Sequence, residues 1–153
     1  MSKSLARVRQ ALQNVSAIVL ETGEARTAQM AADELGVAVD QIAKSIIFRG
    51  EDSGDAVLFI TAGGNQVDHA KAAGLAGEPL GKADAALIRA QTGFAIGGVA
   101  PVGHLNPIRA FLDPRLQDFS LVWAAAGTPR HVFSVSPDDL LRVSGATLVN
   151  FTL

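Results

Sequence analysis

The sequence predicts an α/β or α+β domain whose strands form a mixed sheet. Helical and strand-like segments alternate along the 153 residues in an irregular order, and two apolar segments are joined by a hairpin turn at residues 50–55. A doubly wound parallel sheet would instead need a crossover helix between successive strands. No linker, repeat or low-complexity segment divides the chain, so one domain over residues 1–153 is expected.

Apolar spacing and capping residues place the individual elements. Leu5, Val8 and Leu12 recur at helical spacing, whereas Thr27 and Gly36 begin and end a second helix. The expected elements are helices at 5–12, 28–35, 69–74, 83–91 and 137–144, a helical turn at 39–44, and strands at 15–20, 45–49, 56–62, 94–96, 119–126, 131–135 and 146–152.

The composition excludes several classes of site. The chain has no cysteine, so it has no disulfide framework, no thiolate nucleophile and no cysteine-ligated metal. Its 13 basic and 15 acidic residues give a net charge of −2, which argues against a broad basic surface for long duplexes and therefore against a DNA partner. A small site for one or two phosphates stays compatible with this charge.

Signals for export or membrane insertion are not found in the sequence. The first residues are polar and basic, and the apolar run at 15–20 is too short for a signal core. No apolar run is long enough to span a bilayer. We therefore expect a cytoplasmic protein without a membrane partner.

The common motifs for phosphate, metal and covalent chemistry are also missing. The segment 77–82 is one residue short of a phosphate-binding loop and has Ala83 where Ser or Thr would hold magnesium, so a solvated loop is expected there. His69, His104 and His131 match no local ligand pattern, although distant residues could still combine into a metal site. We expect neither a metal nor a cofactor.

Lys44 is the first candidate functional residue. It stands directly before the apolar strand expected at 45–49. If that strand is central in the sheet, the ammonium group lies at the start of the strand, where a cation can hold a phosphate. An ordinary lysine at the end of a strand, with its ammonium group extended to water, fits the same pattern.

A glycine-rich loop at residues 96–104 is the second candidate. It contains three glycines and one proline within seven residues. Glycine permits close approach of a ligand and proline stiffens the turn, so such a loop can direct amide N–H groups at an oxyanion or a polarised carbonyl. A tight turn with a purely structural role would have the same composition.

His131 is the third candidate. It begins the strand expected at 131–135, after a turn at 127–130 that follows another strand. A histidine in this place either satisfies a structural hydrogen bond or contributes to a site, and its spacing alone does not separate the two.

Taken together and in order, these segments resemble the YbaK/prolyl-tRNA synthetase-associated editing domain family. The resemblance extends from about residue 20 to 150 and rests on the segments Thr27–Gly36, Ile42–Phe48, Gly97–His104, Ala125–Gly127 and Ser136–Leu140. It implies a partial barrel formed by the mixed sheet, with helices around it. It also implies a carboxylic ester hydrolase, because family members remove a wrong amino acid from tRNA, mostly from tRNA for proline. A one-domain chain resembles the free-standing members.

The resemblance also implies residue roles. Lys44 matches the lysine that contacts the phosphate and ribose of the terminal adenosine, and Gly97 and Pro101 match a G-x-x-x-P loop whose amides hold the aminoacyl carbonyl. His131 matches a histidine that positions the aminoacyl group in some members, so Lys44, Gly97 and His131 are the expected catalytic residues. The expected substrate-binding residues are Gly98, Val99, Ala100, Pro101, Gly103 and His104.

The resulting prediction is a trans-acting aminoacyl-tRNA deacylase that supports translation fidelity. Its substrate would be tRNA for proline that carries Ala, Cys, Ser, Thr or 2-aminobutyrate. Its partners would be the 3′ end of aminoacyl-tRNA and a prolyl-tRNA synthetase or an elongation factor. Because the ester is already activated, water, oxyanion stabilisation and positioning suffice without a metal or a triad.

Two alternatives stay open at this point. A non-catalytic module that binds the tRNA acceptor end or a nucleotide, alongside a synthetase, would need Lys44 and the loop but no chemistry. A small hydrolase that acts on another activated ester would hydrolyse free esters and tRNA esters at equal rates.

Overall fold

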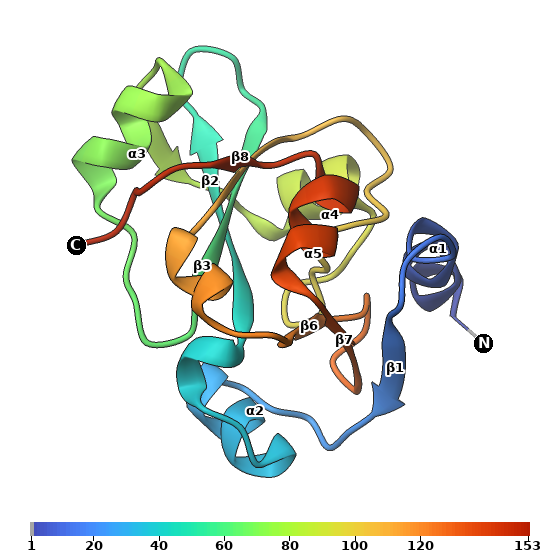
Figure 1. The fold of residues 1–153 in the computed structure, drawn as a ribbon. Helices are drawn as coiled ribbons and strands as arrows, with labels where there is room; N and C mark the ends of the chain where they lie inside the picture. Colours follow the sequence, from blue (N-terminus) through green and yellow to red (C-terminus); the bar gives the residue numbers. More distant parts are fainter. Residues whose placement is uncertain (1) are drawn as a thin grey trace.

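Two β-sheets with helices around them make up the structure, a computed structural model that describes residues 2–153 (Figure 1). The larger sheet has five strands in the order β4-β2-β3-β5-β8, and the smaller has three in the order β1-β7-β6. In chain order the elements are α1 (Lys3–Ala11), β1 (Ile18–Glu21), α2 (Ala28–Leu35), the 3-10 helix η1 (Val39–Gln41), β2 (Ala43–Gly50), β3 (Ala56–Ala62), α3 (His69–Ala76), β4 (Leu80–Lys82), α4 (Ala85–Thr92), β5 (Arg109–Leu112), the 3-10 helix η2 (Pro114–Asp118), β6 (Val122–Ala125), β7 (His131–Val135), α5 (Pro137–Ser144) and β8 (Thr147–Leu148).

The larger sheet is mixed, which confirms the predicted fold class. β2 pairs antiparallel with β3 and β4, whereas β5 runs parallel to both β3 and β8. The smaller sheet is antiparallel throughout. A parallel bridge between Ile42 and Trp123 joins the two sheets, and no closed barrel forms within residues 2–153.

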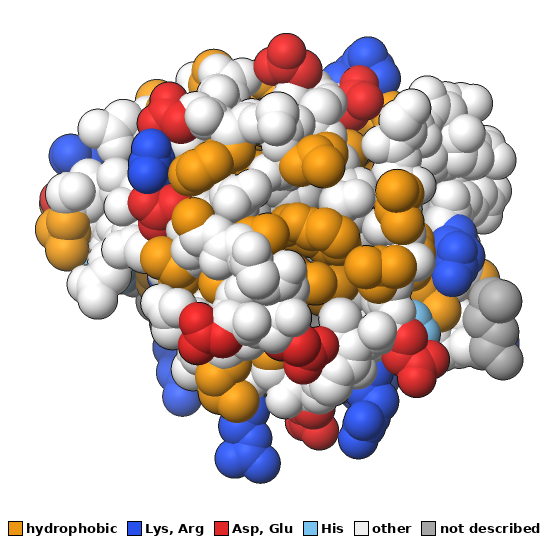
Figure 2. Space-filling view, turned by 60° about the horizontal axis from the view of Figure 1, so that its bottom comes forward, with side chains coloured by type: hydrophobic (Ala, Val, Ile, Leu, Met, Phe, Trp, Pro, Cys, Tyr) orange, Lys and Arg blue, Asp and Glu red, His pale blue; other side chains and the backbone are white. Residues whose placement is uncertain are grey.

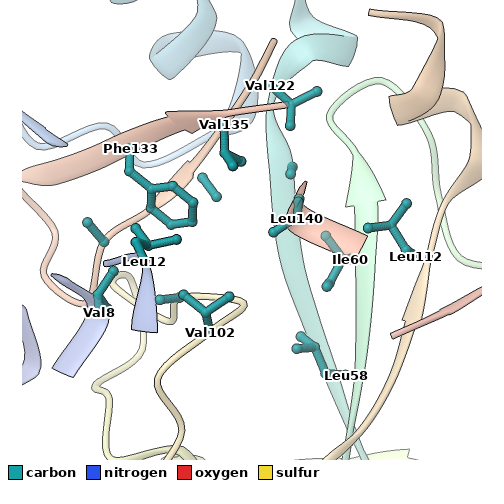
Figure 3. Packing of buried hydrophobic residues seen from close by; sticks show 14 of the residues in the cluster. Val8, Leu12, Leu58, Ile60, Val102, Leu112, Val122, Phe133, Val135 and Leu140 are labelled. Atoms are coloured by element: carbon teal, nitrogen blue, oxygen red, sulfur yellow. The ribbon is translucent and has the colours of Figure 1, made fainter. Parts of the chain in front are cut away.

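The main hydrophobic core fills the space between the two sheets (Figure 3). Leu58 and Ile60 of β3 face this core, as does Phe133 of β7, and all three side chains are fully buried. α1 and the loop before β5 close one end, through Val8 and Val102. A second cluster, which includes Phe59 and Phe151, covers the opposite face of the larger sheet. Successive side chains of β3 therefore point alternately into the two hydrophobic clusters, and every residue of the strand is buried.

Two predicted elements are wrong. Residues 94–96 form no strand, because the Phe94 N–H donates to the Thr92 Oγ1 at 3.1 Å and the Gly98 N–H donates to the Ala95 carbonyl at 3.1 Å, which closes a turn. The segment 77–82 is no solvated loop, because its second half is β4, paired with β2.

Smaller differences concern the ends of elements and one missing strand. The helix expected to end at Gly74 continues to Ala76, and the last strand spans only Thr147–Leu148. β5 was not predicted. It lies between β3 and β8 in the sheet, so its conformation comes from its two neighbours rather than from an apolar run of its own.

Glu78, just before β4, holds the turn between β2 and β3. Its carboxylate accepts the N–H groups of Asp52 and Ser53, each at 2.9 Å, and the Arg109 guanidinium at 2.7 Å. The Ser53 hydrogen bond and the Arg109 guanidinium lower the pKa of Glu78 to about 2. This carboxylate therefore ties three segments of the larger sheet together in its ionised form.

Replacing Glu78 by glutamine is expected to lower stability at pH 7 and to flatten its acid dependence. Because the pKa of Glu78 is lowered to about 2 on folding, its contribution is complete above the unfolded-state pKa and is lost as pH falls towards 2. Urea unfolding at several pH values between 7 and 2 measures this. The difference between wild type and Glu78→Gln should shrink on acidification. The control Glu24→Gln, at an exposed site, should leave the profile of the wild type unchanged.

Candidate active site

A cavity of about 370 Å³ opens between α2, the start of β2 and the β6–β7 pair. Figure 1 places these elements together at the lower side of the molecule. Figure 2 brings that side forward and shows hydrophobic side chains gathered at the centre of the face, with charged side chains around them. The volume lies in the range of small-molecule sites.

The walls of this cavity are mostly small and apolar. Trp123 is the largest wall residue, and Ile42, which directly follows the 3-10 helix η1, forms a β-bridge with it. The other apolar wall residues are Ala25, Ala28, Ala31, Leu35, Ala43, Ile46, Val99, Ala124, Ala125, Pro129 and Val132. Alanine side chains leave space between α2 and the sheets, so the walls suit a small apolar group beside polar ones.

Lys44 lies on this cavity, one residue into β2. Its ammonium group donates to the Gly63 carbonyl at 3.1 Å. Burial lowers the pKa of Lys44, and the charges of Asp40 and Asp113 oppose that effect. A partly desolvated ammonium group with one protein acceptor is well suited to attract an anionic group, since such attraction strengthens away from bulk water.

The glycine-rich loop reaches the same cavity through Gly97 and Val99. Within residues 2–153 the amide N–H groups of these two residues have no protein acceptor, whereas the Gly98 N–H donates to Ala95. Gly97 has a φ of 96°, a conformation that other residues rarely adopt. A Cβ on Gly98 would lie 2.7 Å from the Thr128 carbonyl carbon, so this glycine lets the loop approach the turn before β7.

The rest of the predicted loop site does not line the cavity, since its walls include none of Gly98, Ala100, Pro101, Gly103 and His104. His104 lies 2.7 Å from the Ala100 carbonyl through Nε2 and packs edge-on against Phe94. Burial lowers the pKa of His104, which favours its neutral form. The Gly103 carbonyl accepts from Arg7 Nε at 3.3 Å, so these contacts attach the loop to α1 and the core.

His131 lies on the cavity at the start of β7. Its Nδ1 is 2.7 Å from the Thr128 Oγ1, which also accepts the Arg130 N–H at 3.1 Å. Its Nε2 is 3.7 Å from a carboxylate oxygen of Glu21, the residue of β1 that pairs with His131 in the smaller sheet. The hydrogen bond to Thr128 therefore orients the imidazole, whereas the exposed Glu21 lies beyond hydrogen-bond distance.

Several cavity residues were not found from the sequence. They are Thr22, Arg26, Thr27, Glu34, Ser45, Trp123 and Thr128. Thr27 was identified only as a helix cap, and it does accept the Met30 N–H at 3.1 Å. The others carry no local signal, because pairing of β1 with β7 and packing of α2 bring them together. Among residues 2–153 no group of three or more His, Asp or Glu side chains is arranged to hold a metal.

Comparison with known proteins shows the family of this chain. The family model described as aminoacyl-tRNA editing domain matches residues 22–143, which include every segment that lines the cavity. The chain belongs to the aminoacyl-tRNA editing domain family. Of the helices described in residues 2–153, none has the length and apolar character needed to cross a membrane.

Individual relatives of this editing domain cover most of its length. An uncharacterized protein of Bacillus subtilis, YwhH, is 35% identical over 81% of this chain and 78% of its own. EbsC of Enterococcus faecalis, a candidate Cys-tRNA(Pro)/Cys-tRNA(Cys) deacylase, is 25% identical over 82% of this chain and 77% of its own. A solved structure, described as a candidate trans-editing enzyme for prolyl tRNA synthetase, is 43% identical. It has a TM-score of 0.90 over 100% of this chain and 99% of that one.

Proposed function

We propose that this editing domain is an aminoacyl-tRNA deacylase that acts in trans on tRNA for proline carrying a small wrong amino acid. One observation carries the proposal. A single cavity is lined by Lys44, by His131, and by Gly97 and Val99, whose amide N–H groups have no protein acceptor within residues 2–153. The names of EbsC and of the solved trans-editing relative support the same class of substrate.

In the proposed reaction each group has a defined task. Lys44 holds the phosphate and ribose of the terminal adenosine. The aminoacyl carbonyl accepts from Gly97 and Val99, and His131 positions the aminoacyl group. Water adds to the carbonyl carbon, and the negative charge that develops on the carbonyl oxygen is stabilised by the two amides. The ester C–O bond then breaks, the proton released by the attacking water passes to the ribose oxygen, and the free amino acid leaves.

The alanine-rich wall of the cavity supports a small side chain on the amino acid that is removed from tRNA. Five alanines between α2, β2 and β6 make the wall of this cavity of about 370 Å³ apolar (Ala28, Ala31, Ala43, Ala124 and Ala125). One methylene group changes binding in an apolar pocket by only about 1–3 kcal/mol, so neighbouring small amino acids are expected to be hydrolysed at graded rates. Ala, Cys, Ser, Thr and 2-aminobutyrate are the candidates.

Hydrolysis of a panel of charged tRNAs tests this proposal. Purified protein is mixed with tRNA for proline charged with each of these amino acids, and with Cys-tRNA(Cys). We expect at least one to be deacylated well above the rate of the Lys44→Ala variant, and prolyl-tRNA to be spared. If no substrate is hydrolysed above that variant, while a non-hydrolysable aminoacyl-adenosine binds tightly, the chain is a binding module and the proposal is wrong.

A further inference from the structure

The turn after β3, residues 62–65, supplies the protein acceptor for Lys44. Its Gly63 carbonyl receives the ammonium group at 3.1 Å. Two carboxylates from distant parts of the chain hold this turn, Asp40 in η1 and Asp113 directly after β5. Neither carboxylate lines the cavity.

Asp113 is the more deeply buried of the two, with 2% of its surface exposed. Its Oδ2 accepts the Ala62 N–H at 3.1 Å and the Asn65 side-chain amide at 2.9 Å, and its Oδ1 accepts the Arg115 N–H at 2.9 Å. A buried carboxylate whose two oxygens are both hydrogen-bonded fixes the backbone around it. The end of β3 is therefore pinned one residue before the Lys44 acceptor.

Asp40 completes the arrangement from the other side of the turn. Its Oδ1 accepts the Gly64 N–H at 2.8 Å, one residue after the acceptor, and its Oδ2 accepts Arg115 Nε at 3.0 Å. Arg115 thus joins both carboxylates, through its side chain to Asp40 and its backbone to Asp113. The carbonyl that receives Lys44 is held on both sides.

We propose that Asp40 and Asp113 are positioning residues for Lys44, acting through the 62–65 turn and through their charge. The turn fixes where the ammonium group lies relative to the cavity. The two negative charges favour the protonated ammonium group, whereas burial works against the charged form. The effect on catalysis rests on the proposed deacylase function, whereas the effect on Lys44 itself does not.

The direct test follows Lys44 by NMR. The chain has only four lysines, so 13C-labelled lysine gives four Cε signals that can be titrated separately. We expect the Lys44 signal to titrate at lower pH in Asp113→Asn and in Asp40→Asn than in wild type, because each loses a nearby negative charge. The control Asp118→Asn removes a carboxylate from the outer side of Arg115 and should leave the signal in place. Arg26, Glu34 and His131, which line the same cavity, are unchanged in every variant.

Asp40→Asn keeps the proposal testable if Asp113→Asn, which changes a buried residue, fails to fold. An asparagine at position 40 keeps an oxygen for the Gly64 N–H, so the turn stays held while the charge is lost. Thermal unfolding identifies which variants are folded. An unchanged Lys44 titration in folded Asp40→Asn would overturn the proposal, whatever happens to Asp113→Asn.

A double-mutant comparison separates positioning from a general structural role. Asp40→Ala, which removes the acceptor of the Gly64 N–H and so frees the turn, should lower kcat/KM for deacylation about tenfold in an otherwise wild-type chain, since misplacement of a binding group is costly. It should have no further effect in the Lys44→Ala background. An equal loss in both backgrounds would overturn the proposal. A wild type without deacylase activity would remove the proposed function, and the NMR titration would still decide this inference.

Discussion

Replacing Lys44 by alanine is expected to lower kcat/KM for deacylation by roughly a hundredfold. The substitution removes a partly buried cation from a site that is proposed to bind phosphate. Loss of one partner of a desolvated charge pair costs about 2–5 kcal/mol, and about 1.4 kcal/mol corresponds to tenfold. The loss should fall mainly on KM, because the contact is made in the ground state as well as in the transition state. Single-turnover rates over a range of enzyme concentrations measure both parameters.

A salt titration and a control variant make this prediction specific to Lys44. The plot of log K for binding against log salt concentration should have a shallower slope in Lys44→Ala, by about 0.7, which corresponds to one lost phosphate contact on a single strand. Lys82→Ala is the matched control, because Lys82 is an exposed lysine on the edge strand β4 and lies outside the cavity. An equal loss in both variants, or an unchanged rate and salt slope in Lys44→Ala, would remove Lys44 from the site.

Replacing Gly97 by alanine is expected to lower kcat by about a hundredfold, with little loss of fold. A Cβ at this position meets no atom within 4 Å, so the substitution creates no clash. It does penalise the φ of 96°, and the loop relaxes by rotating the Gly97 peptide and its N–H group. Loss of one donor to a developing oxyanion typically reduces kcat by about 10²–10³-fold. Here KM should change little, which distinguishes this variant from Lys44→Ala.

Gly54→Ala provides the matched control for this substitution. Gly54 also has a positive φ, 76°, and open space around its Cβ position, but it lies in the turn between β2 and β3, away from the cavity. Both variants should lose a similar amount of stability in urea unfolding, about 1 kcal/mol. Only Gly97→Ala should lose turnover. Near wild-type turnover in Gly97→Ala would exclude this loop from the mechanism.

Much of the fold could be predicted because its signals are local. Thr27 and Ser136 each cap a helix by accepting the N–H three residues ahead, and the β2–β3 hairpin follows from two apolar runs around a polar turn. β4 and β5 could not be predicted in the same way. They are short, include Gly81 and Arg109, and are strands only because β2 and β3 pair with them.

The candidate site was predictable only in part. Lys44 and Gly97 could be named because their segments resemble a family in order, and the structure places both on one cavity. Trp123 joins them through its bridge to the distant Ile42, and Thr128 lies in the turn of the β6–β7 hairpin that carries Trp123. Asp113, before Pro114, has the pattern of an ordinary cap for the short helix η2, which its Oδ1 indeed provides. Its contact with the turn next to Lys44 depends on the tertiary fold.

The most direct test of the proposed site is an amide NMR titration with a non-hydrolysable alanyl-adenosine. We expect the N–H signals of Gly97 and Val99 to shift to lower field as these groups bind the carbonyl, and the side-chain signals of Lys44 to shift with them. The same concentrations should inhibit deacylation of the best tRNA substrate. Shifts confined to another region, such as the shallow hollow around Gln91 and Asn106, would contradict the assignment of the active site to this cavity.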